Sequence, residues 1–295
     1  MNNEQLEQMR SGSGFIAALD QSGGSTPSAL AHYGIPREAY HSDAEMLDLM
    51  HEMRTRIMTD PSFRGDRILG AILFEDTMDR KVANLDTPTY LWTERHVVPF
   101  VKVDKGLADE IDGARCMNPM PGLEGLLARA IQKGVFGTKM RSFIHLANAR
   151  GIQAVVDQQF EIGRTIARQG LIPILEPEID ITSPEKSEAE RMLRDAILES
   201  LEGLVTDELV MLKLTLPERD DFYAPLMQHP NVVRVVALSG GYSRDEASSR
   251  LARNHGMIAS FSRALTEGLT VDMSDAAFQQ EFKSAVDQVF SASIT

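Results

Sequence analysis

The most regular feature of the chain is a series of short apolar runs, each rich in β-branched and aromatic residues and each followed by polar residues. Apolar runs without an alternating polar face are typical of strands that are buried on both sides. Eight such runs occur, over residues 14–20, 68–75, 97–104, 136–141, 171–178, 209–216, 232–239 and 257–263. The sequence therefore predicts eight buried strands along nearly the whole chain.

Most segments between these runs carry apolar residues at helical spacing. In the first connection this spacing is shared by Met46, Leu49, Met50, Met53 and Ile57. Helices are predicted in the same way over residues 155–166, 192–204, 243–255 and 274–292. The connection over residues 76–96 contains Pro88 and little periodicity, so we expect it to be mostly loop.

The order of these elements predicts the fold class. Apolar strands that alternate with helices indicate a parallel sheet joined by right-handed crossovers. Eight such units in 295 residues predict an α/β fold, a (β/α)8 TIM barrel. No Gly/Ser/Pro-rich linker divides the chain, so we expect a single domain over residues 1–295 with a short N-terminal helical segment. An open, doubly wound sheet is the structural alternative.

Lys213 lies inside the apolar run over residues 209–216, where a charged amine is costly to desolvate. Burial disfavours the ammonium form and lowers the pKa of a lysine. A neutral lysine is a nucleophile that forms a Schiff base with a carbonyl carbon. The structural alternative is a lysine that reaches water from the strand end or pairs with a buried acid.

Charged pairs at the ends of other strands favour the catalytic interpretation. Three strand ends each carry two charged residues that are two positions apart. The pairs are Lys102 and Asp104, Lys139 and Arg141, and Glu176 and Glu178. Side chains two apart on a strand share one face, and Asp20 ends the first strand in the same way. In a barrel the carboxyl ends of all strands meet at the active-site face. We therefore expect one shared pocket around the amine of Lys213.

Two glycine-containing loops add a signal for phosphate. The seventh strand ends in Ser239-Gly240-Gly241 before a predicted helix, and the eighth supplies Ser260 and Arg263. Glycines let the backbone approach a ligand, and a helix N-terminus together with an arginine favours an anion. The loop after the first strand contains Ser22 and Ser25 around another glycine pair. Either glycine pair alone would indicate only a turn, but together they predict a substrate with a phosphate at each end.

Composition narrows the partners and the compartment. The net charge of −13 argues against nucleic acid or an anionic membrane as a partner. The single cysteine, Cys116, is interpreted as structural and fits a reducing cytoplasm. The N-terminus lacks an apolar signal-peptide core, and no stretch is apolar enough to predict a membrane span. The seven histidines show no metal-binding spacing, so no metal and no cofactor are expected, and a homo-oligomer is left open.

Seven short motifs, in order from about residue 12 to 266, resemble those of class I fructose-bisphosphate aldolases in their compact bacterial form. They are centred on Asp20-Gln21-Ser22, Lys102-Val103-Asp104, Lys139-Met140-Arg141, Glu176-Pro177-Glu178, Leu212-Lys213-Leu214, Ser239-Gly240-Gly241 and Ser260-Phe261-Ser262-Arg263. The resemblance implies metal-independent cleavage of fructose 1,6-bisphosphate to dihydroxyacetone phosphate and glyceraldehyde 3-phosphate in glycolysis or gluconeogenesis.

The resemblance also implies roles for individual residues. Lys213 would form the Schiff base, Glu176 would be the general acid and base, and Asp20 would act at the cleaved carbon–carbon bond. Lys139 would stabilise developing charge, Lys102 would lie near the substrate hydroxyls or the 6-phosphate, and Glu178 would pair with a lysine. The 1-phosphate would be held by Ser239, Gly240, Gly241, Ser260 and Arg263. Ser22 and Ser25 would hold the other phosphate, with Arg141 also binding substrate.

Two departures and two alternatives accompany the resemblance. Animal members end in a tyrosine that assists enamine protonation, whereas the last tyrosine here is Tyr242, so the proton donor is left open. Ser262 stands where animal forms have glycine, so one backbone contact to phosphate is expected to differ. The functional alternatives are another Schiff-base sugar-phosphate aldolase or transaldolase, whose substrates carry one phosphate, and a non-catalytic sugar-phosphate-binding barrel.

Overall fold

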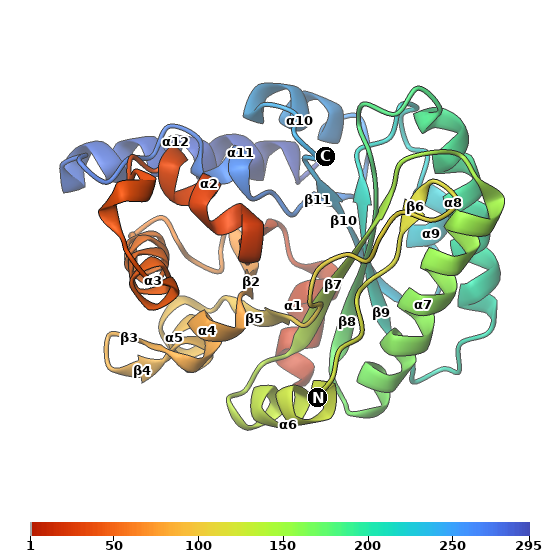
Figure 1. Ribbon diagram of the computed structural model, residues 1–295, viewed down its shortest axis with the longest axis horizontal. Helices are drawn as coiled ribbons and strands as arrows, with labels where there is room; N and C mark the ends of the chain where they lie inside the picture. Colours follow the sequence, from red (N-terminus) through yellow and green to blue (C-terminus); the bar gives the residue numbers. More distant parts are fainter. Residues whose placement is uncertain (1) are drawn as a thin grey trace.

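The computed structural model describes residues 2–295 and shows a nearly closed barrel of parallel strands surrounded by helices (Figure 1). The strand order is β1 (Phe15–Leu19), β2 (Ile68–Leu73), β5 (Val98–Lys102), β7 (Gly137–Ile144), β8 (Ile172–Ile179), β9 (Val210–Thr215), β10 (Val232–Leu238) and β11 (Ile258–Ala259). All neighbours in this order pair in parallel. A 3.1 Å hydrogen bond from the Ala18 amide to the Phe261 carbonyl links the first strand to the segment that follows the last strand. The predicted barrel is therefore confirmed.

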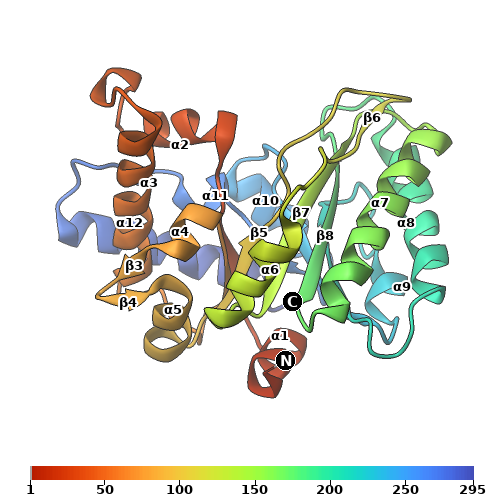
Figure 2. The same ribbon diagram turned by 60° about the horizontal axis from the view of Figure 1, so that its bottom comes forward.

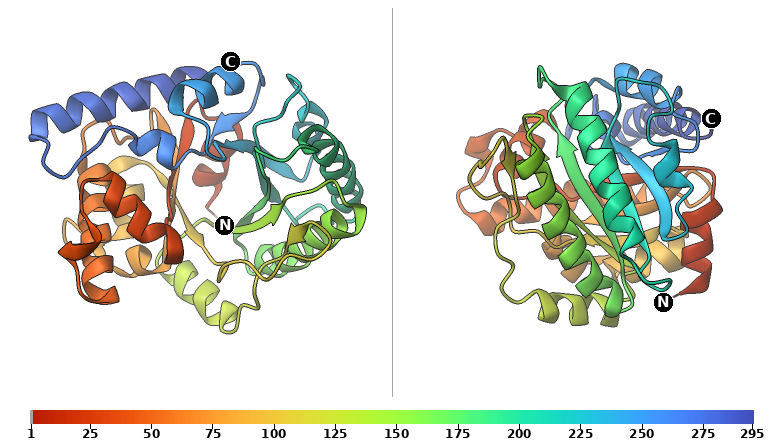
Figure 3. Two further views of the ribbon diagram at one scale, coloured as in Figure 1. Left: turned by 45° about the horizontal axis from the view of Figure 1, so that its top comes forward. Right: turned by 90° about the vertical axis from the view of Figure 1, so that its right-hand side faces the viewer.

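The helices form the outer layer, which Figure 3 shows around the ring of strands. The longer ones are α3 (Asp43–Thr59), α5 (Thr87–Arg95), α6 (Leu123–Gln132), α7 (Ala149–Arg168), α8 (Lys186–Glu202), α10 (Arg244–Leu251) and α12 (Asp275–Ala292). Shorter helices are α2 (Thr26–His32), α4 (Glu75–Asp79), α9 (Ala224–Met227) and α11 (Arg263–Thr266), with 3-10 turns η1 (Gly23–Ser25) and η2 (Arg37–Ala39).

Several sequence-based boundaries were wrong. The connection over residues 76–96 is not mostly loop, because it contains most of α4, all of α5 and a hairpin of β3 (Lys81–Val82) and β4 (Leu85–Asp86). Pro88 occupies the first turn of α5, where the missing amide hydrogen has no partner within the helix anyway. Helix α6 and the short β6 (Ala114–Arg115), which pairs antiparallel with β7, were not predicted.

The last barrel strand is also shorter than predicted. It ends at Ala259, and Arg263 begins α11 instead of ending the strand. The predicted helix over residues 243–255 is likewise reduced to α10, whose N-cap is Ser243. These differences shift Arg263 onto a helix start while leaving it at the same end of the barrel.

Helix α1 (Asn3–Ser11) is the predicted N-terminal helical segment and covers the end of the barrel where the strands begin (Figure 2). The Asn2 side chain caps it by accepting hydrogen bonds from the amides of Glu4 and Gln5. Met9 is fully buried among the apolar residues inside the barrel. The Arg234 guanidinium on β10 donates to the carbonyl oxygens of Met9 (2.9 Å) and Gly12 (2.8 Å), which ties the helix to the sheet.

Side chains alternate between two apolar layers along β9. Met211 belongs to the cluster inside the barrel with Ile174 and Phe100, whereas Leu212 and Leu214 pack in the layer between strands and helices. The alternation places Lys213 inside the barrel, as predicted. Apolar residues thus fill the half of the barrel near α1, and charged residues occupy the half at the strand carboxyl ends.

Candidate active site

A cavity of about 1100 Å³ opens at the carboxyl ends of the strands. Every candidate site residue from the sequence lines it: Asp20, Ser22, Ser25, Lys102, Lys139, Arg141, Glu176, Glu178, Lys213, Ser239, Gly240, Gly241, Ser260 and Arg263. These residues come from seven strands and the loops that follow them, so only the closed barrel brings them together. This volume is slightly larger than is usual for small-molecule sites.

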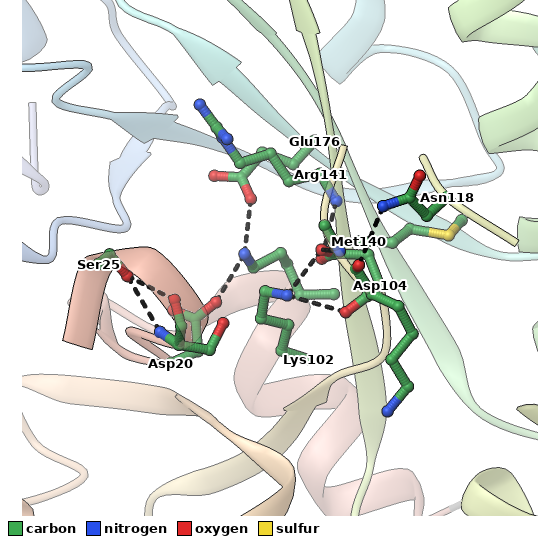
Figure 4. Close-up of polar contacts among 12 residues, drawn as sticks. Asp20, Ser25, Lys102, Asp104, Asn118, Met140, Arg141 and Glu176 are labelled. Carbon is green, nitrogen blue, oxygen red and sulfur yellow. Dashed lines mark hydrogen bonds and ion pairs between the residues drawn. The ribbon is translucent and has the colours of Figure 1, made fainter. Parts of the chain in front are cut away.

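A continuous row of alternating charges forms the floor of the cavity. Lys213 Nζ lies 3.0 Å from Glu176 Oε1, and Glu176 Oε2 lies 2.9 Å from Lys139 Nζ. Lys139 Nζ in turn lies 2.6 Å from Asp20 Oδ2. All four side chains are nearly completely buried, and Figure 4 shows Glu176 and Asp20 on opposite sides of the lysine between them. Two lysines and two carboxyl groups therefore alternate along this row inside the barrel.

The same row sets the protonation states of its members. Burial raises the pKa of Asp20, but the adjacent Lys139 and the nearby Lys213 outweigh burial and hold this pKa at about 2. Burial likewise raises the pKa of Glu176, and the two lysines outweigh it and hold the pKa below its usual value. Burial lowers the pKa of Lys139, whereas Asp20 and Glu176 raise it well above its usual value. Lys139 therefore stays a cation and both carboxyls stay anionic at neutral pH.

The cations beside this row are also paired. Lys102 Nζ donates to Asp104 Oδ1 at 2.6 Å, and the Arg141 amide donates to Asp104 Oδ2 at 3.2 Å (Figure 4). The guanidinium of Arg141 donates from Nε to Glu178 Oε2 at 2.5 Å. The expectation that Glu178 pairs with a lysine was wrong, because Arg141 projects from the neighbouring strand into the reach of Glu178.

The loop after β10 has the features of an anion cradle. Gly240 and Gly241 have φ angles of +61° and +123°, which side chains with a Cβ rarely adopt. An Arg263 guanidinium nitrogen lies 3.5 Å from the place that a Cβ on Gly241 would occupy. The Ser260 hydroxyl is buried, faces the cavity and has no hydrogen-bond partner within residues 2–295. A phosphate there would supply the missing acceptor.

The loop after β1 is more self-contained. Ser25 Oγ accepts from the Ser22 amide at 3.0 Å and donates to the Ser22 carbonyl at 2.9 Å. The hydroxyl proton of Ser25 is therefore used within the η1 turn, whereas Ser22 lines the cavity. A second phosphate site on this loop stays a prediction.

Comparison with known proteins gives the family. The model for the family described as "Glycolytic: Fructose-bisphosphate aldolase class-I" matches residues 7–219. The chain belongs to this family. It is 58% identical over 294 residues to fructose-bisphosphate aldolase class 1 of Synechocystis sp., a match that covers 100% of this chain and 98% of that protein. It is 53% identical to the enzyme of the same name from Porphyromonas gingivalis, with 100% of both chains covered.

A solved structure supports the fold of this aldolase family member independently. The fructose-bisphosphate aldolase of Plasmodium falciparum matches with a TM-score of 0.76, and the alignment covers 98% of this chain and 92% of that one. The sequence identity is 20%, so this likeness concerns the fold alone.

Between Asn2 and Thr295 no group of three or more His, Cys, Asp or Glu side chains is placed to hold a metal ion. Over the same residues, the helices are too short or too polar to cross a membrane. Tyr242 lines the cavity, and its ring packs under the Arg250 guanidinium at 4.5 Å.

The sequence predicted no side-chain role for Gln21, Arg54 and Ser262 in the pocket region. Gln21 and Ser262 line the cavity, and Arg54 lies fully buried behind the loop of Gln21. A signal for Arg54 does exist, since it lies one turn from Met50 and from Met58 on the apolar face of α3. An arginine at such a position must find partners inside the protein.

Proposed function

We propose that this chain cleaves fructose 1,6-bisphosphate reversibly to dihydroxyacetone phosphate and glyceraldehyde 3-phosphate through an imine on Lys213. The observation that supports it best is the buried contact between Lys213 Nζ and Glu176 Oε1, 3.0 Å apart, in a cavity large enough for a sugar bisphosphate. Membership of the class I aldolase family gives the contact its meaning.

The pair supplies both groups that imine formation requires. Transfer of one proton from the Lys213 ammonium to Glu176 produces a free amine and a neutral acid at the same time. The amine adds to the ketone carbon to form a carbinolamine, and Glu176 returns the proton to its hydroxyl, which leaves as water. The resulting iminium bears the positive charge beside the bond that is to break.

Cleavage then uses the rest of the buried row. A carboxylate, which we assign to Asp20, accepts the proton of the hydroxyl on the far carbon as the carbon–carbon bond breaks. The bonding electrons move to the iminium nitrogen and form an enamine. Lys139, held between Asp20 and Glu176, stabilises negative charge that develops on the oxygen of the departing aldehyde. Protonation of the enamine and addition of water release the second product and the free lysine.

The phosphates would be held at the two ends of the cavity. We assign one to Ser239, Gly240, Gly241, Ser260 and Arg263, and the other to the loop of Ser22 and Ser25 with help from Lys102 and Arg141. In the structure Lys102 and Arg141 are paired with Asp104 and Glu178, so binding of the second phosphate would have to compete with or extend these ion pairs.

The alternatives are less well supported. An aldolase for a substrate with one phosphate would not require two loops of this kind. A non-catalytic sugar-phosphate-binding barrel would have no use for four buried charges in a row, since burying ionised groups is energetically costly. Three further points stay predictions: a single domain over residues 1–295, a cytoplasmic location and a homo-oligomer. The cytoplasmic location rests on the single cysteine.

The decisive experiment is chemical trapping. Borohydride added together with dihydroxyacetone phosphate should reduce the imine and fix one adduct, which mass spectrometry would locate on the peptide that contains Lys213. Lys213→Arg keeps the charge but cannot form the imine, so it should abolish both the adduct and cleavage. Lys283→Arg, on the exposed face of α12, is the matched control and should retain both. An adduct on Lys102 or Lys139 would assign the nucleophile elsewhere.

A further inference from the structure

Arg54 is fully buried, and all its hydrogen bonds within residues 2–295 go to neutral oxygens. Its guanidinium donates to Thr77 Oγ1 at 2.7 Å, to the Gln21 carbonyl at 2.5 Å and to Gln21 Oε1 at 3.4 Å. The Nε atom has no partner among the described residues. A buried guanidinium that forms no salt bridge is costly, so the position calls for a functional reason.

The charge of this arginine is nevertheless retained. Burial lowers the pKa of Arg54 to about 10, and the negative charges of Asp20 and Asp76 act in the opposite direction. Arg54 is therefore a cation at neutral pH. A guanidinium has only donors, so whatever atom faces it must be an acceptor.

This restriction fixes the direction of a chain of hydrogen bonds. Since Arg54 faces Gln21, the Gln21 side chain must present its oxygen to Arg54 and its amide hydrogens to the other side. There Nε2 donates to Ser262 Oγ at 2.7 Å. A serine hydroxyl that accepts from an amide must direct its own single proton elsewhere. Within residues 2–295 the Ser262 hydroxyl donates to no protein atom, and Ser262 lines the cavity.

We propose that Arg54 and Gln21 orient the Ser262 hydroxyl as a hydrogen-bond donor to the substrate phosphate that is bound by the loops after β10 and β11. Ser262 lies between Ser260 and Arg263 in the sequence, and all three residues line the cavity. The Ser262 hydroxyl therefore lies near two other groups that can bind a phosphate, the Ser260 hydroxyl and the Arg263 guanidinium. The positive charge at the buried end polarises every bond of the chain in the same direction and strengthens the last donor. The inference rests on the proposed function only in requiring a phosphate at this end of the cavity.

Arg54 and Gln21 act here as positioning residues, and Ser262 as a binding residue. The arrangement also ties the loop after β1 to the loop after β11, which are 241 residues apart in sequence. Arg54 belongs to a third segment, α3, and anchors the chain from behind the barrel. A purely structural link would hold the loops together whatever the direction of the Ser262 hydroxyl proton.

The test measures inhibition by inorganic phosphate and the KM for fructose 1,6-bisphosphate in the full chain. Ser262→Ala should raise both the inhibition constant of phosphate and the KM by roughly tenfold, as expected for the loss of one hydrogen bond to a charged group. The kcat should change less than about twofold. Ser249→Ala, an exposed serine on α10, is the control and should match the unaltered protein. Unchanged phosphate inhibition and unchanged KM in Ser262→Ala would overturn the proposal.

A double-mutant cycle tests the orienting role. Gln21→Leu should weaken phosphate inhibition in the parent protein but have little further effect in the Ser262→Ala background, because both changes remove the same donor. Fully additive losses would show that Gln21 acts through loop structure alone. Arg54→Met should behave like Gln21→Leu. Thermal unfolding would show whether the Arg54→Met protein folds, and if it does not, the Gln21→Leu variant alone provides the test.

These outcomes separate the inference from the proposed function. If the unaltered protein forms no borohydride adduct and cleaves no bisphosphate, the proposed function fails, whatever the result for Ser262. The role of Ser262 would then be tested by calorimetry, which measures the binding of inorganic phosphate directly and needs no enzyme activity. If the unaltered protein is active and the Ser262→Ala protein has unchanged constants, only the inference fails.

Discussion

Glu176 Oε1 lies 3.0 Å from Lys213 Nζ, and both side chains are at most 5% exposed. The second carboxylate oxygen of Glu176 faces Lys139 at 2.9 Å, so one carboxylate serves two lysines. The two lysines nevertheless differ, because Lys139 also contacts Asp20, whereas Glu176 is the only carboxylate within ion-pair distance of Lys213 among residues 2–295. Lys139 is thus fixed as the cation of the row, and Lys213 is the lysine whose proton Glu176 can take.

Glu176→Gln should reduce kcat by about 100-fold to 10,000-fold, the usual contribution of a general acid and base. The glutamine keeps the volume of the side chain but can neither take the proton of Lys213 nor return it to the carbinolamine. Steady-state kinetics and the rate of borohydride trapping would measure the loss. The matched control is Glu190→Gln, which breaks the buried pair of Glu190 with Lys186 outside the cavity. Retention of kcat in Glu176→Gln would remove Glu176 from the chemistry.

Asp20 should make the stability of the protein sensitive to acid. Its pKa is about 2 in the folded state and about 3.8 when unperturbed, because Lys139 and Lys213 outweigh the effect of burial. A depressed pKa stabilises the folded state above about pH 4, and the contribution, about 2 kcal/mol, is lost as the pH falls toward 2. Urea unfolding should show that Asp20→Asn has a lower free energy of unfolding than the parent at pH 6. At pH 3 roughly half of the contribution from the depressed pKa should be lost, so the difference between the two proteins should be smaller. A pH-independent difference would contradict the argument.

Gly240→Ala should impair phosphate binding through the backbone. The φ angle of +61° costs a residue with a Cβ about 1 kcal/mol, and the added atom would lie 2.6 Å from Ile181 Cγ2. Gly170→Ala is a sharp control, because Gly170 has a φ of +84° with no atom near the added methyl and lies after α7, outside the cavity. Both variants should lose stability in thermal unfolding. Only Gly240→Ala should raise the KM for the bisphosphate.

Chelation should leave the activity unchanged. In the proposed mechanism the iminium nitrogen on Lys213 accepts the electrons of the breaking bond, so no divalent metal is needed as a Lewis acid. Cleavage measured after prolonged incubation with EDTA should equal that of the untreated protein. Loss of activity that zinc restores would contradict the Schiff-base mechanism.

The parts of the site that sequence could predict follow from local geometry. Strand side chains alternate, so the positions of Lys213 with Met211, and of Glu176 with Glu178, could be assigned to the cavity side before the register was known. The carboxyl ends of parallel strands meet, so the charged pairs were expected together. The Lys102–Asp104 pair could also have been foreseen, because opposite charges two residues apart share a face.

The parts that sequence could not predict depend on how distant segments pack. Arg141 reaches Glu178 because β7 and β8 adopt one particular register, which the apolar runs alone leave undetermined. The contact of Arg54 with Gln21 requires α3 to pack behind the loop after β1. The helix α5 escaped prediction because it is held by contacts with neighbouring elements more than by its own weak periodicity.

Arg263→Ala should weaken binding of the bisphosphate by about 1.5–3 kcal/mol, the range for hydrogen bonds to charged groups. Arg263 begins α11 at the mouth of the cavity, and no ion pair within residues 2–295 occupies its guanidinium, which lies beside Gly241. Its charge is therefore available to a phosphate, and its removal should raise the KM more than it lowers kcat.

The matched control is Arg253→Ala, which removes an exposed arginine that pairs with Asp220 at 3.1 Å outside the cavity. This change should leave the KM unaltered, because the pair is exposed and remote from the substrate. Isothermal calorimetry with inorganic phosphate would separate loss of the anion site from an effect on chemistry. If Arg263→Ala folds normally and binds phosphate and bisphosphate like the parent, the phosphate must lie on the amides of Gly240 and Gly241 and the hydroxyl of Ser260 without the arginine.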